Sequence, residues 1–269
     1  MITSSIVTYY RKDSSEVRRK KQILYENIMF LANDDNITEI AVIDNSPKDD
    51  LKTLSKISPK IRYIYLNGEN IGFSKAHNIS RKLISEKRYH IIVNPDIIFT
   101  DKNIISELKS VMDSRNDVSL IQPLIKYQDH KTVQKLCKRN PTFLIQFFRA
   151  FLGKYINKFS FLRNYNNWFE MDDLAYKKDE VESEYLSGCF MFIRRTALEE
   201  VNWFDEDFFL YLEDADLTRK LSLTGKCLHY PKLSISHVWE RGSHKSLKLK
   251  LIAIKSFFIY SFKWGFRLF

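Results

Sequence analysis

Short runs of branched apolar residues alternate with amphipathic stretches over the first hundred or so residues of the chain. The run Ile91–Val93 has no polar alternation, which is typical of a strand that is buried on both faces. Between such runs, apolar residues recur at helical spacing, as in Val17, Leu24, Ile28 and Leu31. This alternation predicts a mostly parallel, Rossmann-like α/β sheet flanked by helices. The predicted strands cover residues 4–9, 39–44, 61–66 and 90–93, and the predicted helices begin near residue 13, run through Ala76 to Leu83, and span 101–112.

The strand that ends at Val93 is followed by Asn94, Pro95 and Asp96. Proline has no N–H to donate to a sheet, so the strand must stop there. Asp96 is therefore expected at the carboxyl end of a central strand, where open α/β sheets bind their ligands. A carboxylate in this place suits Mg²⁺ or Mn²⁺, which share their coordination with substrate phosphates. A plain turn is the alternative, because Asn, Pro and Asp all favour turns.

The loop at residues 67–74 contains Gly68 and Gly72, two of only seven glycines in the chain. Glycine allows a close approach of backbone to ligand, and the start of the following helix can hold an anion. The spacing does not match the G-x-G-x-x-G dinucleotide fingerprint. A tight structural turn is the alternative.

A second group of candidate catalytic residues follows in the last third of the chain. Residues 185–193 predict a small-residue turn that leads into a strand, and a short helix follows at 196–201. The next helix carries Asp214 on the face of Leu217 and Leu221, whereas Asp216 shares another face with Lys220 and is expected to pair with it in solvent. This helix is expected to stop at Gly225. A partly buried acid favours a general-base role for Asp214, and simple helix capping by Glu213 and Asp214 is the alternative. His237 lies near the end of a later strand and becomes a metal ligand if an acidic site is nearby.

The net charge of +10 and the pI near 9.3 indicate an anionic partner: nucleic acid, a membrane surface or a phosphorylated substrate. Residues 130–169 carry eight Lys or Arg, and residues 241–269 carry seven, with no acid in either segment and many aromatics in both. Most of the aromatics at 130–169 are expected to pack inward between two helices. The alternative is a surface for an anionic or amphipathic partner. No nucleic-acid-binding motif is present, which argues against nucleic acid.

The three cysteines, Cys137, Cys189 and Cys227, lie far apart and form no metal-binding spacing. They predict neither a disulfide framework nor a zinc site, and they fit a reducing compartment. The first residues contain no basic leader with a long apolar run, so no secretion signal is expected. No segment approaches the length of a membrane-spanning helix. We therefore expect a cytoplasmic protein that contacts the inner face of the plasma membrane peripherally.

The order of several short motifs resembles the family 2 glycosyltransferases of the GT-A fold, in particular their bacterial rhamnosyltransferase-like branch. The resemblance covers most of residues 2–240. The motifs that carry it are Thr8-Tyr9-Tyr10-Arg11, Val42-Ile43-Asp44-Asn45-Ser46, Asn70-Ile71-Gly72-Phe73-Ser74 with Asn78, Asn94-Pro95-Asp96, Leu186-Ser187-Gly188-Cys189-Phe190-Met191, Phe204-Asp205-Glu206-Asp207-Phe208-Phe209, Leu212-Glu213-Asp214-Ala215-Asp216-Leu217 and His237.

The resemblance implies an inverting, metal-dependent transfer of a sugar from a dTDP- or UDP-sugar, with dTDP-L-rhamnose expected first, to a growing surface polysaccharide or lipid-linked glycan. Asp214 would be the base with Glu213 beside it, and Asp96 and His237 would hold Mg²⁺ or Mn²⁺. Asp96 is the one acid left of a D-x-D motif that reads Asn94-Pro95-Asp96 here. The remaining implied positions bind the nucleotide-sugar (Thr8, Tyr10, Arg11, Asp44, Asn45, Asn70, Gly72, Phe73, Asn78, Asn94 and Asp96) or the acceptor (Ser187, Gly188, Cys189 and Glu213).

The expected organisation is a GT-A domain at 1–240 followed by a basic amphipathic helical segment at 241–269. Within the domain, residues 1–125 form a nucleotide-sugar-binding half, 126–180 a helical insertion, and 181–240 an acceptor and catalytic half. The alternative function is a non-catalytic module of the same fold that binds a membrane or a polyanion. The basic excess favours that alternative, and the presence of Glu213, Asp214 and His237 argues against it.

Overall fold

A nine-stranded sheet forms the centre of the computed structural model, which describes residues 1–11, 14–85, 87–177, 179–238 and 247–269. The strand order is β3-β2-β1-β4-β10-β6-β11-β5, with β8 paired to β11 outside this order, and β7 and β9 form a separate two-stranded sheet. The strands are β1 Ile2–Thr8, β2 Ile37–Asp44, β3 Ile61–Tyr65, β4 Tyr89–Val93, β5 Ile97–Ile98, β6 Val118–Lys126, β7 Cys137–Lys138, β8 Val181–Glu182, β9 Tyr185–Leu186, β10 Phe190–Arg194 and β11 Lys226–His237.

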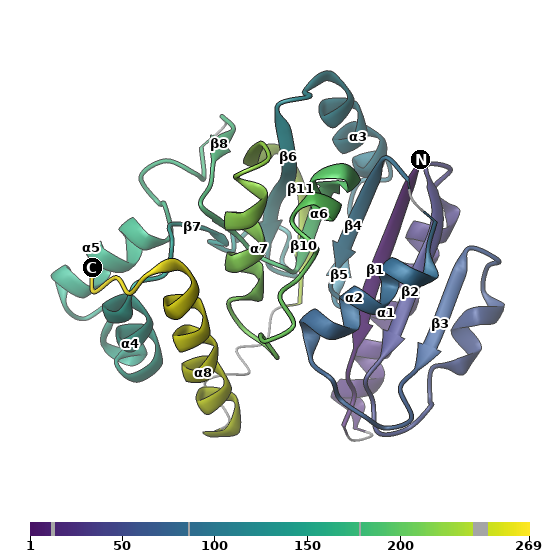
Figure 1. Cartoon of the computed structure of the whole chain (residues 1–269), viewed down its shortest axis with the longest axis horizontal. Coiled ribbons are helices and arrows are strands. Elements are labelled where there is room, and N and C mark those ends of the chain that lie inside the picture. Colours follow the sequence, from purple (N-terminus) through teal and green to yellow (C-terminus); the bar gives the residue numbers. More distant parts are fainter. Residues whose placement is uncertain (12–13, 86, 178, 239–246) are drawn as a thin grey trace.

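Helices connect and cover these strands, and their order along the chain matches the predicted alternation in the first half. They are α1 Ser15–Asn33, α2 Phe73–Leu83, α3 Ile104–Ser114, α4 Phe143–Phe151, α5 Ser160–Phe169, α6 Arg195–Glu200, α7 Glu213–Leu221 and α8 Leu247–Trp264, with short 3₁₀ turns η1 Lys52–Lys56 and η2 Gly153–Tyr155. Figure 1 shows β1, β2 and β3 at one end of the molecule and α4, α5 and α8 at the other. Residue 13, where a helix start is predicted, and residues 239–246 lie outside the described residues.

The sheet is mixed but mostly parallel, which confirms the predicted fold class. Strands β1, β2, β3 and β4 run parallel, and so do β6 and β11, whereas β10 runs antiparallel to both β4 and β6. In the register, Thr8 lies beside Asp44, and Ile6 lies beside Val93. The carboxyl ends of β1, β2 and β4 therefore meet at one edge, where the polar residues that follow them gather.

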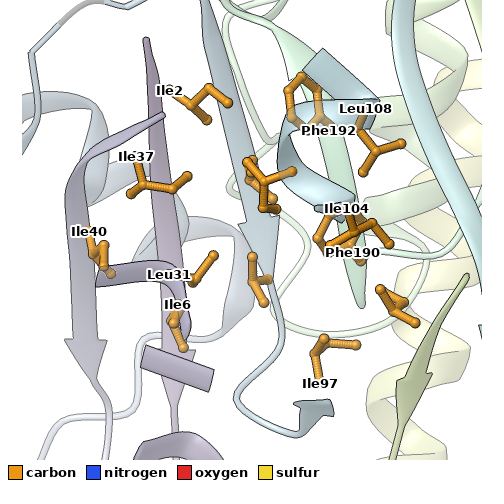
Figure 2. Close-up of a cluster of buried hydrophobic side chains, with 14 of the residues drawn as sticks. Ile2, Ile6, Leu31, Ile37, Ile40, Ile97, Ile104, Leu108, Phe190 and Phe192 are labelled. Carbon is orange, nitrogen blue, oxygen red and sulfur yellow. The ribbon is translucent and has the colours of Figure 1, made fainter. Parts of the chain in front are cut away.

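Both faces of β4 are covered by apolar side chains, as its unbroken apolar run predicts. Ile91 and Val93 pack with residues of α1 and α3 in one cluster, part of which Figure 2 shows around Ile6, Leu108 and Phe190. Ile92 points into a second cluster on the opposite face. All three β4 residues have no exposed surface. A strand buried in this way provides a rigid support for the residues that follow it.

Helix α7 lies where the sequence predicted a helix, but two details of that prediction are wrong. The helix ends at Leu221, and Gly225 makes no left-handed cap; a Cβ at Gly225 would lie 2.5 Å from the Ser119 hydroxyl, so glycine is needed for close packing. Asp216 is fully buried rather than solvent-exposed. Its carboxylate accepts hydrogen bonds from the Trp264 indole at 2.7 Å and the Lys263 ammonium at 3.0 Å, because α8 covers this face.

The expectation that most aromatics of residues 130–169 pack inward is also wrong. Five large aromatics of this segment are exposed: Phe147, Phe151, Phe159, Phe161 and Trp168. Helices α4 and α5 are short and amphipathic, and they bury only one or two side chains each. In the described part of the chain, no helix is both long and apolar enough to cross a bilayer.

Candidate active site

A cleft of about 1630 Å³ opens at the edge where the carboxyl ends of the parallel strands meet. Most of the site residues expected from the sequence line it, although they come from positions throughout the chain. They are Thr8, Tyr10, Arg11, Asn45, Asn70, Gly72, Phe73, Asn94, Asp96, Ser187, Gly188, Cys189, Glu213, Asp214 and His237. The structure therefore brings Asp96, Asp214 and His237 together around one cleft.

Two expected site residues, Asp44 and Asn78, do not line the cleft. The Asp44 carboxylate is fully buried and accepts hydrogen bonds from the Thr8 hydroxyl at 2.9 Å and the Tyr63 hydroxyl at 3.0 Å. Asn78 donates to the Phe204 carbonyl at 3.0 Å and accepts from the Phe204 amide at 3.2 Å. In this structure both side chains hold neighbouring segments in place, one beneath the end of β1 and the other beneath the loop before α7.

His237 and Asp96 form a pair at one side of the cleft. The His237 Nε2 atom lies 3.2 Å from Asp96 Oδ1, and the backbone N–H of Val238 donates to the Asp96 carbonyl at 3.0 Å, so the end of β11 is tied to the turn after β4. Strand β5 contributes to the same contact, because His237 is in register with Ile97.

Gln134 determines which nitrogen of His237 carries the proton. Its amide nitrogen donates to two carbonyls, those of His237 at 2.7 Å and Lys126 at 3.3 Å, so its oxygen must face the ring. That oxygen lies 3.1 Å from His237 Nδ1, which must therefore be an N–H donor. Nε2 then faces the Asp96 carboxylate, an arrangement in which a nitrogen and an oxygen could share a cation. Nothing about Gln134 in the sequence indicated this role.

Helix α7 presents its first residues to the cleft through an unusual backbone. Tyr211 and Leu212 both have positive φ angles, 74° and 65°. Such conformations are costly for residues with side chains and cluster at functional sites. They turn the chain sharply, so that Glu213 and Asp214 enter the cleft at the start of the helix.

Asp214 is partly exposed to the cleft and is held by backbone donors. Its carboxylate accepts from the Gly188 N–H at 2.9 Å and the Ala215 N–H at 3.0 Å. A Cβ at position 188 would lie 3.1 Å from the Asp214 Cβ, so the small residue in the 186–189 turn permits this contact. The turn and the acid, which the sequence analysis treated as separate motifs, form one unit.

Glu213 differs from its neighbour. It is only 6% exposed, and its Oε2 has no hydrogen-bond partner among the described residues. Burial, and then the charge of Asp214, raises the pKa of Glu213 well above its ordinary value. The raised pKa favours the protonated form of Glu213, which suits a hydrogen-bond donor better than a base.

Gly72 joins the loop at residues 67–74 to the segment before α7. Its φ is 90°, and a Cβ there would lie 2.5 Å from the Phe209 carbonyl oxygen. The same carbonyl accepts from the Phe73 N–H at 2.8 Å, and the Asn45 amide donates to the Gly72 carbonyl at 3.1 Å. The predicted backbone role of Gly72 is thus present, although its close neighbour here is protein backbone.

Three cleft-lining side chains have a buried polar atom without a partner in the described structure: Tyr10 Oη, Asn45 Oδ1 and Glu213 Oε2. Buried polar atoms are seldom left unpaired, and each such case calls for an explanation. Their gathering in one cleft points to a polar ligand that supplies the missing hydrogen bonds.

No family model matches the chain. Among curated proteins, it is 29% identical to the rhamnosyltransferase WbbL of Escherichia coli over 239 residues, which cover 86% of this chain and 80% of WbbL. It is 25% identical to the N-acetylglucosaminyl-diphospho-decaprenol L-rhamnosyltransferase of Mycobacterium tuberculosis over 195 residues, 66% of this chain and 59% of that enzyme.

Solved glycosyltransferases share the fold at much lower identity. The mannosyltransferase PcManGT of Pyrobaculum calidifontis, solved with GDP-Man and Mn²⁺, superposes with a TM-score of 0.57 at 13% identity, over 97% of this chain and 64% of that one. TarS of S. aureus, residues 1–349, superposes with a TM-score of 0.54 at 14% identity, over 98% and 73%.

The fold and the curated relatives together define the chain as a nucleotide-sugar glycosyltransferase with the GT-A architecture. It is an enzyme rather than a binding module. The curated proteins to which it is similar are rhamnosyltransferases, and its motifs resemble those of family 2 glycosyltransferases.

Proposed function

We propose that the chain catalyses an inverting, metal-dependent transfer of a sugar, with dTDP-L-rhamnose the first donor to test, to a lipid-linked glycan or growing surface polysaccharide. The observation that carries the proposal is the arrangement of Asp214 and the Asp96–His237 pair in one cleft. The names of the curated relatives support rhamnose and a lipid diphosphate acceptor. In this proposal, residues 1–125 bind the nucleotide-sugar and residues 181–240 bind the acceptor.

In this proposal Asp214 acts as the base. Its carboxylate takes the proton of the acceptor hydroxyl while the hydroxyl oxygen bonds to the anomeric carbon of the donor sugar. The bond from that carbon to the diphosphate breaks, and the diphosphate leaves with the electron pair. Attack from the face opposite the leaving group inverts the anomeric centre. Protonated Glu213 donates a hydrogen bond to the acceptor beside the base.

Asp96 and His237 are the residues that would hold Mg²⁺ or Mn²⁺. The described residues contain no cluster of three protein ligands, and Mg²⁺ commonly takes only one or two carboxylates and completes its shell with substrate phosphates and water. The carboxylate oxygen and the ring nitrogen with its lone pair fit this pattern. When bound, the ion would neutralise charge on the leaving diphosphate.

Removal of the Asp96 carboxylate should abolish the metal dependence of donor binding. In calorimetric titrations with dTDP-L-rhamnose or UDP-sugars, we expect the wild-type protein to bind at least tenfold more tightly with Mn²⁺ than with EDTA. Asp96→Ala should bind with equal, weak affinity in both. Asp101→Ala, an exposed acid after β5, is the control. Equal Mn²⁺ enhancement in Asp96→Ala would contradict the proposed metal site.

We also propose that helix α8 lies against an anionic membrane. Five apolar residues recur along one stripe of this helix, and each is exposed: Leu247, Leu251, Ile254, Phe258 and Phe262. The helix carries four lysines and no acid. An apolar stripe flanked by cations is typical of a helix that lies in a membrane interface.

Co-sedimentation with lipid vesicles tests this surface. We expect binding to vesicles that contain phosphatidylglycerol, weak binding to pure phosphatidylcholine, and weakening by salt because the attraction is partly electrostatic. Phe262→Asp should reduce binding severalfold, whereas Leu223→Asp, at an equally exposed leucine outside the stripe, should not. Equal binding to both kinds of vesicle would contradict the role of the lysines.

A further inference from the structure

The cleft has two chemically different arms. One arm is polar and is lined by the residues that follow β1, β2 and β4. The other runs between α4 and α8, which lie side by side, and its lining is largely aromatic and aliphatic. The apolar lining residues are Phe143, Phe147, Phe151, Ile254, Phe257 and Phe258. A nucleotide-sugar has no apolar part long enough to use the second arm, so another substrate must account for it.

Lys138 lies where the two arms meet. Strand β7 pairs with β9, with Lys138 opposite Tyr185, and the Lys138 ammonium lies 4.6 Å from the centre of the Tyr185 ring. No carboxylate of the described residues forms an ion pair with it. Burial and the nearby Arg149 lower the pKa of Lys138 to about 8, although the charge of Asp214 acts in the opposite direction. A half-buried cation without a counter-ion is costly, and an anionic ligand would relieve that cost.

Other cations line the apolar arm. Lys154 and Lys250 border it and, among the residues that the structure describes, have no carboxylate partner. Arg149 is different, because Glu170 accepts from it at 2.7 Å. The arm therefore combines a long apolar wall with unpaired positive charge near the proposed base, a combination that fits an amphipathic anion.

We infer that the arm between α4 and α8 binds the hydrocarbon chain of a prenyl phosphate ester, and that Lys138 binds its phosphate. The inference rests on the proposed function and assigns the acceptor side of the same cleft. The diphosphate of the nucleotide donor is the other anion available to Lys138, so the experiment must separate the two sources. The sugar of the acceptor would then lie beside Asp214 while its lipid extends toward the exposed stripe of α8.

The test is calorimetry with soluble probes in EDTA, which removes metal-assisted binding of diphosphates at Asp96 and His237. We expect farnesyl diphosphate to bind the wild-type protein, and farnesol and inorganic diphosphate to bind at least tenfold more weakly. Lys138→Met should weaken farnesyl diphosphate tenfold or more. Lys158→Met, in the same basic segment but outside the cleft lining, should bind like wild type.

A steric variant tests the apolar arm separately. Ala253 lines the arm, and Ala253→Trp should block farnesyl diphosphate, whereas Leu223→Trp, at an exposed leucine outside both the cleft lining and the stripe, should not. Donor binding with Mn²⁺ is measured in every variant. If the wild-type protein bound the donor but not farnesyl diphosphate, the inference would be overturned and the proposed function would remain. If Lys138→Met lost donor binding but kept farnesyl diphosphate binding, Lys138 would be assigned to the nucleotide, and the inference would again be overturned.

Discussion

Asp214→Asn should lower the rate of sugar transfer by about a thousandfold, within the range that a positioned general base contributes. The amide is nearly isosteric with the carboxylate but cannot take a proton. Its oxygen can still accept the Gly188 N–H bond, so the turn beneath it should keep its shape. Donor affinity, measured by calorimetry with Mn²⁺, should change less than threefold, because Asp96 and His237 are untouched.

Glu213→Gln is the matched control for this prediction. Burial and the charge of Asp214 raise the pKa of Glu213 and favour its neutral form, which a neutral amide replaces closely. We expect a loss of less than about tenfold in transfer, far smaller than for Asp214→Asn. If the two substitutions reduced transfer equally, or if Glu213→Gln were the more damaging, the assignment of the base to Asp214 would be wrong.

The folded state should lose stability steeply as the pH falls from about 6.5 toward 5. Three histidines outside the cleft lining, His77, His90 and His229, are buried. Burial lowers the pKa of His77 to about 3 and the pKa of His229 to about 4, and burial with the charges of Arg195 and His77 holds the pKa of His90 well below its ordinary value. The unfolded chain binds these protons near pH 6.5, so their contribution is complete above that pH and decreases below it.

Protonation of Glu213 affects the stability of the folded state in the opposite direction. Its raised pKa means that the folded protein holds a proton that the unfolded chain releases above about pH 4.5, so acidification favours folding through this group. The pKa values of His77 and His229 in the folded protein, about 3 and about 4, mean that unfolding near pH 5.5 takes up about one proton at each. Each proton corresponds to about 1.4 kcal/mol per pH unit, so these two groups predict a loss of roughly 3 kcal/mol per pH unit there.

Urea unfolding at pH 8, 7, 6 and 5 measures this slope. Above pH 7 the free energy of unfolding should change little from these groups. In His229→Leu the slope between pH 6 and 5 should decrease by about 1.4 kcal/mol per pH unit, because one titrating group is gone. A free energy of unfolding that stays constant from pH 7 to pH 5 in the wild type would contradict the neutral, buried state of the histidines.

His77 and His90 also show why buried polar residues occur inside the sheet. The Ser5 hydroxyl lies 2.8 Å from His77 Nδ1 and 2.9 Å from His90 Nε2, and the Thr3 hydroxyl lies 2.8 Å from His90 Nδ1. The polar residues in the middle of β1 are therefore the partners of two histidines that arrive from α2 and β4. The alternation of residues in β1 alone did not indicate this network.

The features that were predictable from sequence are those with local causes. The apolar run of β4 and the proline after it place Asp96 at the end of a central strand without knowledge of the rest of the chain. The outcome for Asp216 shows the limit. Helical periodicity correctly separated its face from that of Leu217, but solvent exposure of that face depends on α8, which lies about fifty positions later and supplies Lys263 and Trp264.

The candidate site was predictable as a set of motifs but not as a set of contacts. Local patterns singled out Asp96, Asp214 and His237 one by one and the resemblance linked their roles, but only the fold shows that they share a cleft. Gln134 and Lys138 lie in a segment noted for its basic charge and aromatics, where neither residue stood out. Their roles depend on tertiary contacts, with His237 for Gln134 and with Tyr185 for Lys138. Patterns within one sequence do not reveal such contacts.

The contact between Gly72 and the Phe209 carbonyl has a consequence for attempts to alter specificity by recombination. It joins the loop at residues 67–74, which we propose faces the donor, to the segment that precedes Asp214, and the fit leaves no room for a Cβ. A chimaera that takes one half from this chain and the other from a relative must therefore inherit both sides of this contact from compatible parents. Otherwise the chimaera would displace Asp214 even though it was designed to change only the residues proposed to bind the sugar.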